Sequence, residues 1–210
     1  MVNIELKKKV VGTLATNCYI ISSNMEHPDC PATAVKEGII IDPGDEPEKI
    51  ISAIKDISIK YILLTHNHPD HIGAVEALKH KLSRDTINRV QCGIHTLDRI
   101  KVLWANGTTF DFEFSEGEEI KFGAERLKVM HTPGHTPGSC CFIIGEQLET
   151  MSLFSGDTLF SGGYGRTDFP GGSEVELFKS IAKLLCLPPE TKVYPGHGDI
   201  TTIGDEKRYY

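Results

Sequence analysis

Three histidines and one aspartate fall within six positions of the segment Thr65-His66-Asn67-His68-Pro69-Asp70-His71. His66 and His68 are two positions apart, so their side chains point to the same side of an extended segment. Histidine and aspartate both bind divalent metal ions, and free imidazoles are rarely grouped without one. The preceding residues 60–64, which are hydrophobic after Lys60, predict a buried strand. The chain must therefore fold so that this strand ends at a metal centre.

Further ligands must come from other parts of the chain, because one loop cannot complete a coordination sphere. Three candidates lie in Gly/Pro-rich turns further along the sequence: His135, Asp157 and His197. Each turn follows an apolar, strand-like run, at residues 127–130, 151–154 and 192–194. Functional groups are usually placed on loops that a rigid sheet holds at its strand ends. We therefore expect these three side chains to meet the histidine cluster.

The order of these motifs resembles that of a known family. HxHxDH at residues 66–71 is followed by HTPGHTPG at 131–138, SGD at 155–157 and GH at 196–197. This order, over residues 13–197, resembles the metallo-β-lactamase superfamily. The strings GDTLF at 156–160 and GRTDFPGG at 165–172 resemble its glyoxalase II-like (hydroxyacylglutathione hydrolase-like) branch.

The resemblance implies two metal positions and seven ligands. The first metal would be held by His66, His68 and His135. The second would be held by Asp70, His71 and His197. Asp157 would bridge both metals, and Asp70 and Asp157 would be the catalytic carboxylates. Imidazole and carboxylate ligands suit zinc, iron and manganese alike, and we expect two divalent ions, with zinc as the first choice.

The resemblance also implies a reaction, in which a water activated by two metal ions hydrolyses a thioester. The expected substrate is a small molecule, S-lactoylglutathione or a related small thioester. Full-length glyoxalase II has an extra C-terminal helical region that supplies glutathione contacts, whereas residues 198–210 after the last motif are mostly polar. A smaller or broader thioester substrate is therefore an open alternative.

Other activities fit the same motifs. Persulfide dioxygenases share the fold and a similar GRTDF string, and use one iron on two histidines and one aspartate, which here would be His66, His135 and Asp157. Hydrolysis of a lactone or β-lactam is a weaker alternative. A non-enzymatic metal-binding module is disfavoured, because all seven ligand positions carry the expected residue. A purely structural zinc site would not need two metals with a coordination position left open for water or substrate.

Three further polar residues are candidates for supporting the site or binding substrate. Asp42 precedes Pro43 at a strand end, where it could accept a hydrogen bond from a ligand histidine or serve only the turn. Arg166 could bind a substrate carboxylate, or it could pair with Asp168 and brace the loop. The sequence favours neither reading.

The composition is that of one globular domain, residues 1–210, with 40% hydrophobic and 24% charged residues. Besides the runs named above, residues 18–22, 38–41, 90–94, 118–122, 126–130 and 140–144 predict strands. Apolar residues at helical spacing predict helices over residues 46–57, 72–82, 96–104 and 173–187, and Ser173 is the expected N-cap of the last one. These patterns alone indicate a mixed α and β protein. The resemblance implies an α+β fold, a four-layer αββα sandwich with the metals at one edge between the sheets.

Charge and hydropathy limit the partners. The net charge of -7 argues against a nucleic-acid-binding surface. No apolar run has the length of a signal peptide or a membrane span, so we expect a cytoplasmic protein without a membrane partner. The six cysteines form no CxxC pair and are expected to be reduced. The sequence is silent on oligomeric state. We expect ordinary roles for the remaining histidines, His27, His80, His95 and His131.

Overall fold

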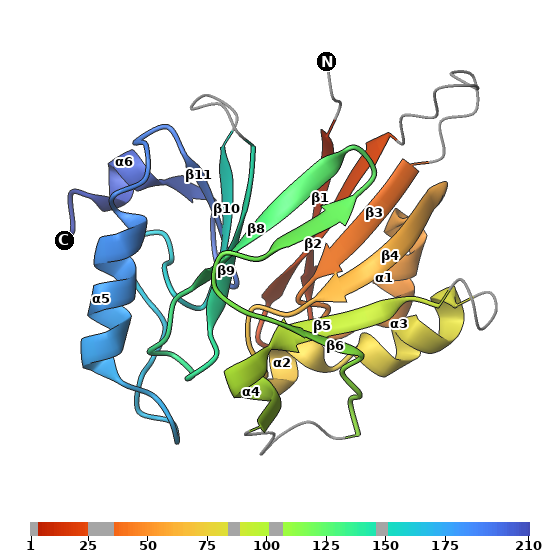
Figure 1. The fold of residues 1–210 in the computed structure, drawn as a ribbon, viewed down its shortest axis with the longest axis horizontal. Coiled ribbons are helices and arrows are strands. Elements are labelled where there is room, and N and C mark those ends of the chain that lie inside the picture. Colours follow the sequence, from red (N-terminus) through yellow and green to blue (C-terminus); the bar gives the residue numbers. More distant parts are fainter. Residues whose placement is uncertain (1–3, 25–35, 84–88, 101–106, 146–150) are drawn as a thin grey trace.

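Two six-stranded sheets face each other in the computed structural model, which describes residues 4–24, 36–83, 89–100, 107–145 and 151–210 (Figure 1). The first sheet has the order β1-β2-β3-β4-β5-β6. Its strands are β1 Ile4–Val11, β2 Thr16–Asn24, β3 Lys36–Ile41, β4 Ile57–Leu63, β5 Gln91–His95 and β6 Phe112–Phe114. The pairs β1/β2 and β2/β3 are antiparallel, whereas β3 to β6 run parallel. The carboxyl ends of β3, β4 and β5 therefore meet at one edge.

The second sheet has the order β12-β11-β10-β9-β8-β7. Its strands are β7 Glu119–Phe122, β8 Glu125–His131, β9 Cys140–Ile144, β10 Ser152–Gly156, β11 Lys192–Pro195 and β12 Thr201–Thr202. Only β10 and β11 pair in parallel. The carboxyl ends of β8, β10 and β11 carry the three turns that the sequence singled out.

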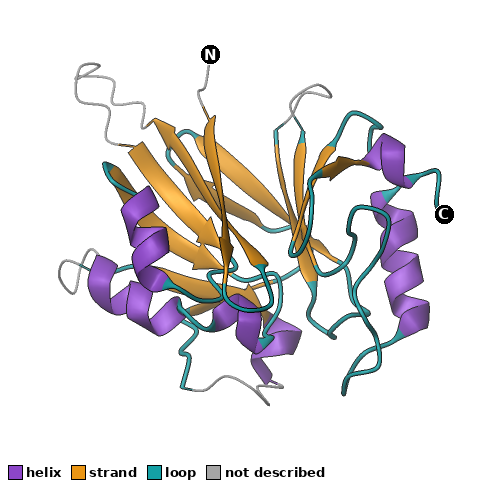
Figure 2. Ribbon diagram, turned by 180° about the vertical axis from the view of Figure 1, so that it is seen from behind, coloured by secondary structure: helices purple, strands orange, loops and turns teal. Residues whose placement is uncertain are grey.

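Helices cover the outer face of each sheet, as Figure 2 shows from behind. The helices α1 Pro47–Ala53, α2 Pro69–Ile72, α3 Val75–Leu82 and α4 Thr96–Ile100 follow strands of the first sheet, and α5 Glu174–Leu184 and α6 Ile203–Glu206 belong to the second. The core divides accordingly. Ile40 packs under α1 and α3, whereas its neighbours Ile39 and Ile41 face Phe142 and Phe154 of the other sheet. This period-two alternation confirms the expected four-layer αββα sandwich.

Helix boundaries depart from the sequence-based expectation. The helix expected over residues 46–57 ends at Ala53, because Asp56 has a left-handed backbone (φ 66) and Ile57 already begins β4. The helix expected over 72–82 is α3, which begins only at Val75, and a separate short helix, α2, precedes it and ends at Ile72. The helix expected over 173–187 ends at Leu184, and Ser173 caps it as expected, accepting a hydrogen bond from Glu176 N.

Five elements were not expected: β1, β6, β12, α2 and α6. Three expectations fall on residues outside the described ranges: the end of a helix expected over 96–104, the loop around His27, and Cys30. No helix of the described residues is both long and apolar enough to cross a membrane.

Candidate metal centre

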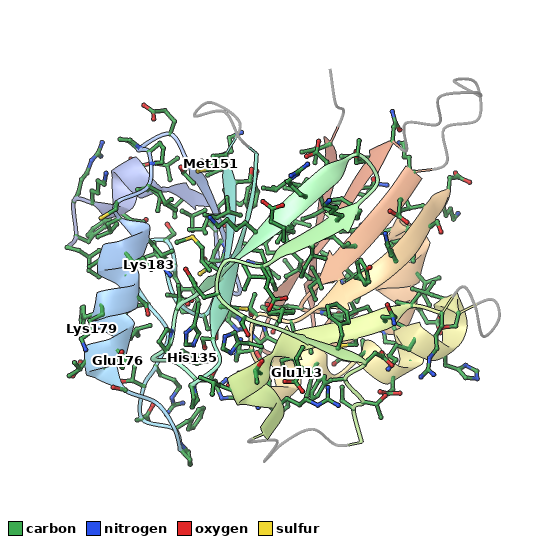
Figure 3. All side chains as sticks on the ribbon, viewed as in Figure 1. Glu113, His135, Met151, Glu176, Lys179 and Lys183 are labelled. Atoms are coloured by element: carbon green, nitrogen blue, oxygen red, sulfur yellow. The ribbon has the colours of Figure 1, made fainter. Side chains whose placement is uncertain are left out.

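Seven candidate ligands come from four strand ends and meet in one place. His66 and His68 follow β4, and Asp70 and His71 lie in α2 just after them. His135 lies between β8 and β9, Asp157 directly follows β10, and His197 follows β11. The first four therefore come from the first sheet and the last three from the second. Figure 3 shows His135 at the lower end of the strands, between the two halves of the molecule.

The first group contains His66, His68 and His135, whose ligand atoms all lie within 4.8 Å of one another. His135 Nε2 is 3.2 Å from His66 Nε2 and 2.9 Å from His68 Nδ1. The side chains of His66 and His135 are almost fully buried. Three ring nitrogens of two sheets thus point at a common centre.

The second group contains Asp70, His71 and His197. His71 Nε2 is 3.3 Å from His197 Nε2, and Asp70 Oδ2 is 3.2 Å from that same His197 nitrogen. Asp157 stands between the groups: its Oδ2 is 3.5 Å from His135 Nε2 and 3.6 Å from His197 Nε2. Asp157 is therefore placed to contact both centres.

The outward-facing nitrogens of four histidines each have a fixed partner. Nδ1 of His71 donates to Asp42 Oδ2 (2.9 Å), that of His135 to Arg166 O (2.7 Å) and that of His197 to Leu14 O (3.1 Å). Nδ1 of His66 lies 3.0 Å from Thr65 Oγ1, whose own proton goes to Asp42. Because Nδ1 carries the proton in each neutral ring, Nε2 presents a lone pair to the centre.

This arrangement fits two metal ions. Lone pairs that face each other at about 3 Å repel unless a cation lies between them, and nitrogens bound to a tetrahedral zinc are about 3.3 Å apart. Asp157 Oδ1 is buried and has no hydrogen-bond partner among the described residues. A Cβ at Gly196 would lie 2.2 Å from this oxygen, so only glycine leaves room for the carboxylate here. The donor set therefore fits a pair of divalent cations.

The pKa shifts separate the histidines into the same two groups: the pKa is lowered in the first group and raised in the second. Burial holds the pKa of His66 well below its ordinary value, and lowers that of His68 to about 4 and that of His135 to about 3. Burial alone would also lower the pKa of His71, but the carboxylates of Asp157 and Asp42 raise it to about 9. Burial raises the pKa of Asp157. Without metal, the first group is neutral and the second binds a proton.

Comparison with known proteins agrees with this geometry. The sequence pattern of the metallo-beta-lactamase superfamily matches residues 11–197. This chain belongs to the metallo-beta-lactamase superfamily. The hydroxyacylglutathione hydrolase GloC of Haemophilus influenzae is 38% identical over 82% of this chain and 85% of its own length.

Two solved structures show the same superfamily fold. TTHA1623 in a di-iron-bound form has a TM-score of 0.77 and 33% identity, and the match covers 97% of this chain and 98% of that one. ETHE1 from Myxococcus xanthus has a TM-score of 0.75 and 28% identity, over 98% of this chain and 82% of that one. The similarity to this superfamily therefore spans both sheets.

Asp42 lies where a residue that orients a ligand should lie. Its carboxylate accepts hydrogen bonds from His71 Nδ1 and from both Thr65 N (2.8 Å) and Thr65 Oγ1 (2.6 Å). The side chain of Asp42 is buried. Of the two readings that the sequence left open for Asp42, these contacts support the orienting one.

Arg166 and Asp168 form an exposed pair beside this centre. Arg166 Nε and Nη2 each donate to an Asp168 oxygen at 2.6 Å. The guanidinium also lies 4.0 Å from the centre of the Phe169 ring, which meets His68 edge-on at 5.6 Å. These contacts support the reading in which the pair braces its loop, and they place Phe169 as a wall of the centre.

Sequence reasoning missed two residues that hold the second group. Thr16 Oγ1 donates to Asp70 Oδ2 (3.0 Å), and Thr16 also forms a β-bridge with His197. Asn17 Nδ2 donates to Pro195 O and Gly198 O on either side of His197. No spacing in the sequence links residues 16–17 to the other ligands, so only the pairing of the folded chain reveals them.

The remaining histidines of the described ranges stay outside the centre. His80 is exposed on α3. His95 and His131 stack with ring centres 4.2 Å apart and planes 8° apart, and His131 Nε2 lies 2.9 Å from Pro137 O. Neither belongs to a group of described residues that could hold a metal, as expected from the sequence.

The metal-free protein should lose stability as the pH falls from 6.5 to 5. The pKa of His68 is lowered to about 4 and that of His135 to about 3, whereas unfolded histidine titrates near 6.5. In this pH range these histidines bind protons in the unfolded chain but stay neutral in the folded protein. The free energy of unfolding therefore decreases as the pH falls. Urea unfolding of chelator-treated protein at several pH values measures this slope, and a midpoint that stays constant would contradict it.

Proposed function

We propose that this protein is a metal-dependent hydrolase of small thioesters. The observation that carries the proposal is the convergence of five imidazoles and two carboxylates. In four of these rings, Nδ1 has a hydrogen-bond partner that keeps the proton there, so that Nε2 offers its lone pair to a metal. His66, His68 and His135 would hold one ion, Asp70, His71 and His197 the other, and Asp157 would bridge them. Two bound divalent ions supply an activated water and polarise a substrate carbonyl.

The protein's own groups favour direct attack by water over a covalent intermediate. Among the described residues, no serine or cysteine beside the ligands is paired with a base. Ser155 Oγ donates to Leu159 O (2.7 Å), and burial raises the pKa of Cys141 to about 11. Asp157 Oδ1, which lacks a donor among the described residues, can accept a hydrogen bond from the attacking water and orient it.

We choose a thioester as the substrate because of one homologous protein and because of the side chains around the metal centre. The hydroxyacylglutathione hydrolase of Haemophilus influenzae supports this chemistry. Phe169 offers an apolar surface beside His68, where an acyl group can pack. Zinc is the first choice of metal, iron and manganese are compatible with the same ligands, and we place the reaction in the cytoplasm.

The first experiment is hydrolysis of S-lactoylglutathione by the purified protein, with and without a chelator. We expect turnover that falls to background after chelation and returns when zinc, iron or manganese is added. Metal analysis of the active protein should give two ions per chain. A metal-replete protein that hydrolyses neither this thioester nor smaller ones would contradict the proposal.

A persulfide dioxygenase activity is the second candidate. The observation that favours it is a set of two histidines and one carboxylate, His66, His135 and Asp157. His135 Nε2 lies 3.2 Å from His66 Nε2 and 3.5 Å from Asp157 Oδ2. The di-iron form of TTHA1623 shows that a fold relative holds iron. One iron per chain, together with oxygen uptake on a persulfide, would favour this activity over hydrolysis.

A further inference from the structure

Asp98 is a fully buried carboxylate outside the seven candidate ligands. It lies on α4, and its side chain is 0% exposed. Its Oδ2 accepts the hydroxyl proton of Thr136 at 2.7 Å, and its Oδ1 accepts Gly138 N at 2.7 Å. Among the described residues, no lysine, arginine or histidine forms an ion pair with it. Both of these donors belong to the turn that carries His135, and the backbone of Asn67 also forms a hydrogen bond with this carboxylate.

The backbone of Asp98 holds the other ligand loop. Asp98 O accepts a hydrogen bond from Asn67 Nδ2 at 2.8 Å. Asn67 is buried and stands between the ligands His66 and His68. One residue therefore contacts both loops that supply the first group of ligands.

These two loops belong to different sheets. The loop of Asn67 follows β4 of the first sheet, and the turn of Thr136 joins β8 and β9 of the second. The first metal position needs nitrogens from both, so its geometry depends on how far apart the loops are held. A Cβ at Gly138 would lie 2.6 Å from Asp98 Oδ1, so the backbone of the turn approaches this carboxylate as closely as glycine permits.

We propose that Asp98 is a positioning residue that clamps the two loops together and thereby sets the first metal position. This inference rests on the ligand assignment of the proposed function. A buried carboxylate without a cation is costly to desolvate. The hydrogen bonds from Thr136 and Gly138 offset this cost, and together with the contacts of Asn67 they fix one ligand loop against the other.

The clamp is selective, because the second group is held by other contacts. His71 is held by Asp42, Asp70 by Thr16, and His197 by Leu14 O. None of these contacts involves Asp98. Loss of Asp98 should therefore weaken the first metal position and leave the second in place.

The test is the metal content of Asp98→Ala, titrated with zinc from the chelated protein. We expect wild type to bind two zinc ions, and Asp98→Ala to bind the first-site ion about 10- to 100-fold more weakly, the usual effect of removing a group that orients ligands. In ¹⁵N spectra of histidine side chains, the rings of His66, His68 and His135 should lose their zinc-bound shifts first. The rings of His71 and His197 should keep theirs.

Two variants separate positioning from a general loss of structure. Asp98→Asn should bind both zinc ions as wild type does. The asparagine Oδ1 can accept a hydrogen bond from Gly138 N, and its Nδ2 can donate one to Thr136 Oγ1. Asp111→Ala is the matched control, because Asp111 also joins two segments, accepting Cys92 N and pairing with Lys79, but contacts no ligand loop. It should lower thermal stability and leave zinc binding unchanged.

The outcomes are distinct. If Asp98→Ala binds both ions as wild type does, or loses both equally while Asp111→Ala keeps them, the clamp is wrong. If wild type itself binds fewer than two ions, the proposed centre fails and the inference fails with it. Should Asp98→Ala not fold, Thr136→Val removes only one arm of the clamp, and the same selective but smaller loss is expected.

Discussion

Asp157→Ala should lower both metal content and activity, the latter by at least about 100-fold. Loss of a group that merely orients a ligand costs about 10- to 100-fold, and in the proposed assignment Asp157 would bind both metals directly. Its Oδ2 lies 3.5 Å from His135 Nε2 and 3.6 Å from His197 Nε2, one nitrogen from each group. In that assignment, its removal would take a ligand from each ion and the acceptor for the attacking water. Metal analysis and steady-state hydrolysis measure the two effects.

The control is His131→Ala, which removes an imidazole from the start of the turn that carries His135 without removing a candidate ligand. His131 contacts Pro137 O and the ring of His95. Its loss should leave metal content and rate nearly unchanged. An Asp157→Ala protein that keeps two metals and the full rate would rule out the bridging role, and metal loss in His131→Ala would mean that the ligand of this turn was misassigned.

The candidate ligands could be named from the sequence because their chemistry is concentrated in short motifs. The cluster of residues 66–71 and the three Gly/Pro-rich turns are each visible without a structure. The residues that hold those ligands could not be found in this way. Thr16 meets Asp70 across 54 positions, and Asp98 meets Thr136 across 38. The first contact joins two segments of the first sheet, and the second joins the two sheets. Such contacts form only in the folded chain, and no local pattern encodes them.

The missed elements have a similar cause. The strand β1 is an edge strand with a half-exposed burial pattern and three lysines in a row, so its apolar alternation is weak. The strand β6 has only three residues and gains its partner from β5, 19 positions earlier. Edge strands depend on a neighbour that the chain supplies from a distance, whereas the central strands β3 and β4 can be identified from their own hydrophobic residues.

Asp42→Ala should destabilise the fold by about 3 kcal/mol or more and also weaken the second metal position. Three buried donors lose their acceptor: Thr65 N, Thr65 Oγ1 and His71 Nδ1. A buried donor left without a partner costs about 1–3 kcal/mol. Asp42 also has a left-handed backbone (φ 50), in which alanine is about 1–2 kcal/mol less favourable than in its usual conformations. Urea unfolding and zinc titration measure the two losses.

The pH dependence of this loss identifies its source. In the metal-free protein, burial alone would lower the pKa of His71, but Asp157 and Asp42 raise it to about 9. A raised histidine pKa stabilises the fold fully below about pH 6.5. That stability is lost as the pH rises through 9. The difference in unfolding free energy between wild type and Asp42→Ala should therefore be larger at pH 6 than at pH 10.

Asp42→Asn separates the electrostatic role of this side chain from its place in the turn. Asparagine tolerates the left-handed backbone and can still accept Thr65 N. Its amide N–H₂ then faces His71 Nδ1, which must give up its proton to accept, so the proton moves to Nε2 and faces the metal. We expect a smaller loss of stability than in Asp42→Ala but the same weakening of the second ion. If Asp42→Asn binds two zinc ions as tightly as wild type, Asp42 serves the turn alone and does not fix the tautomer of His71.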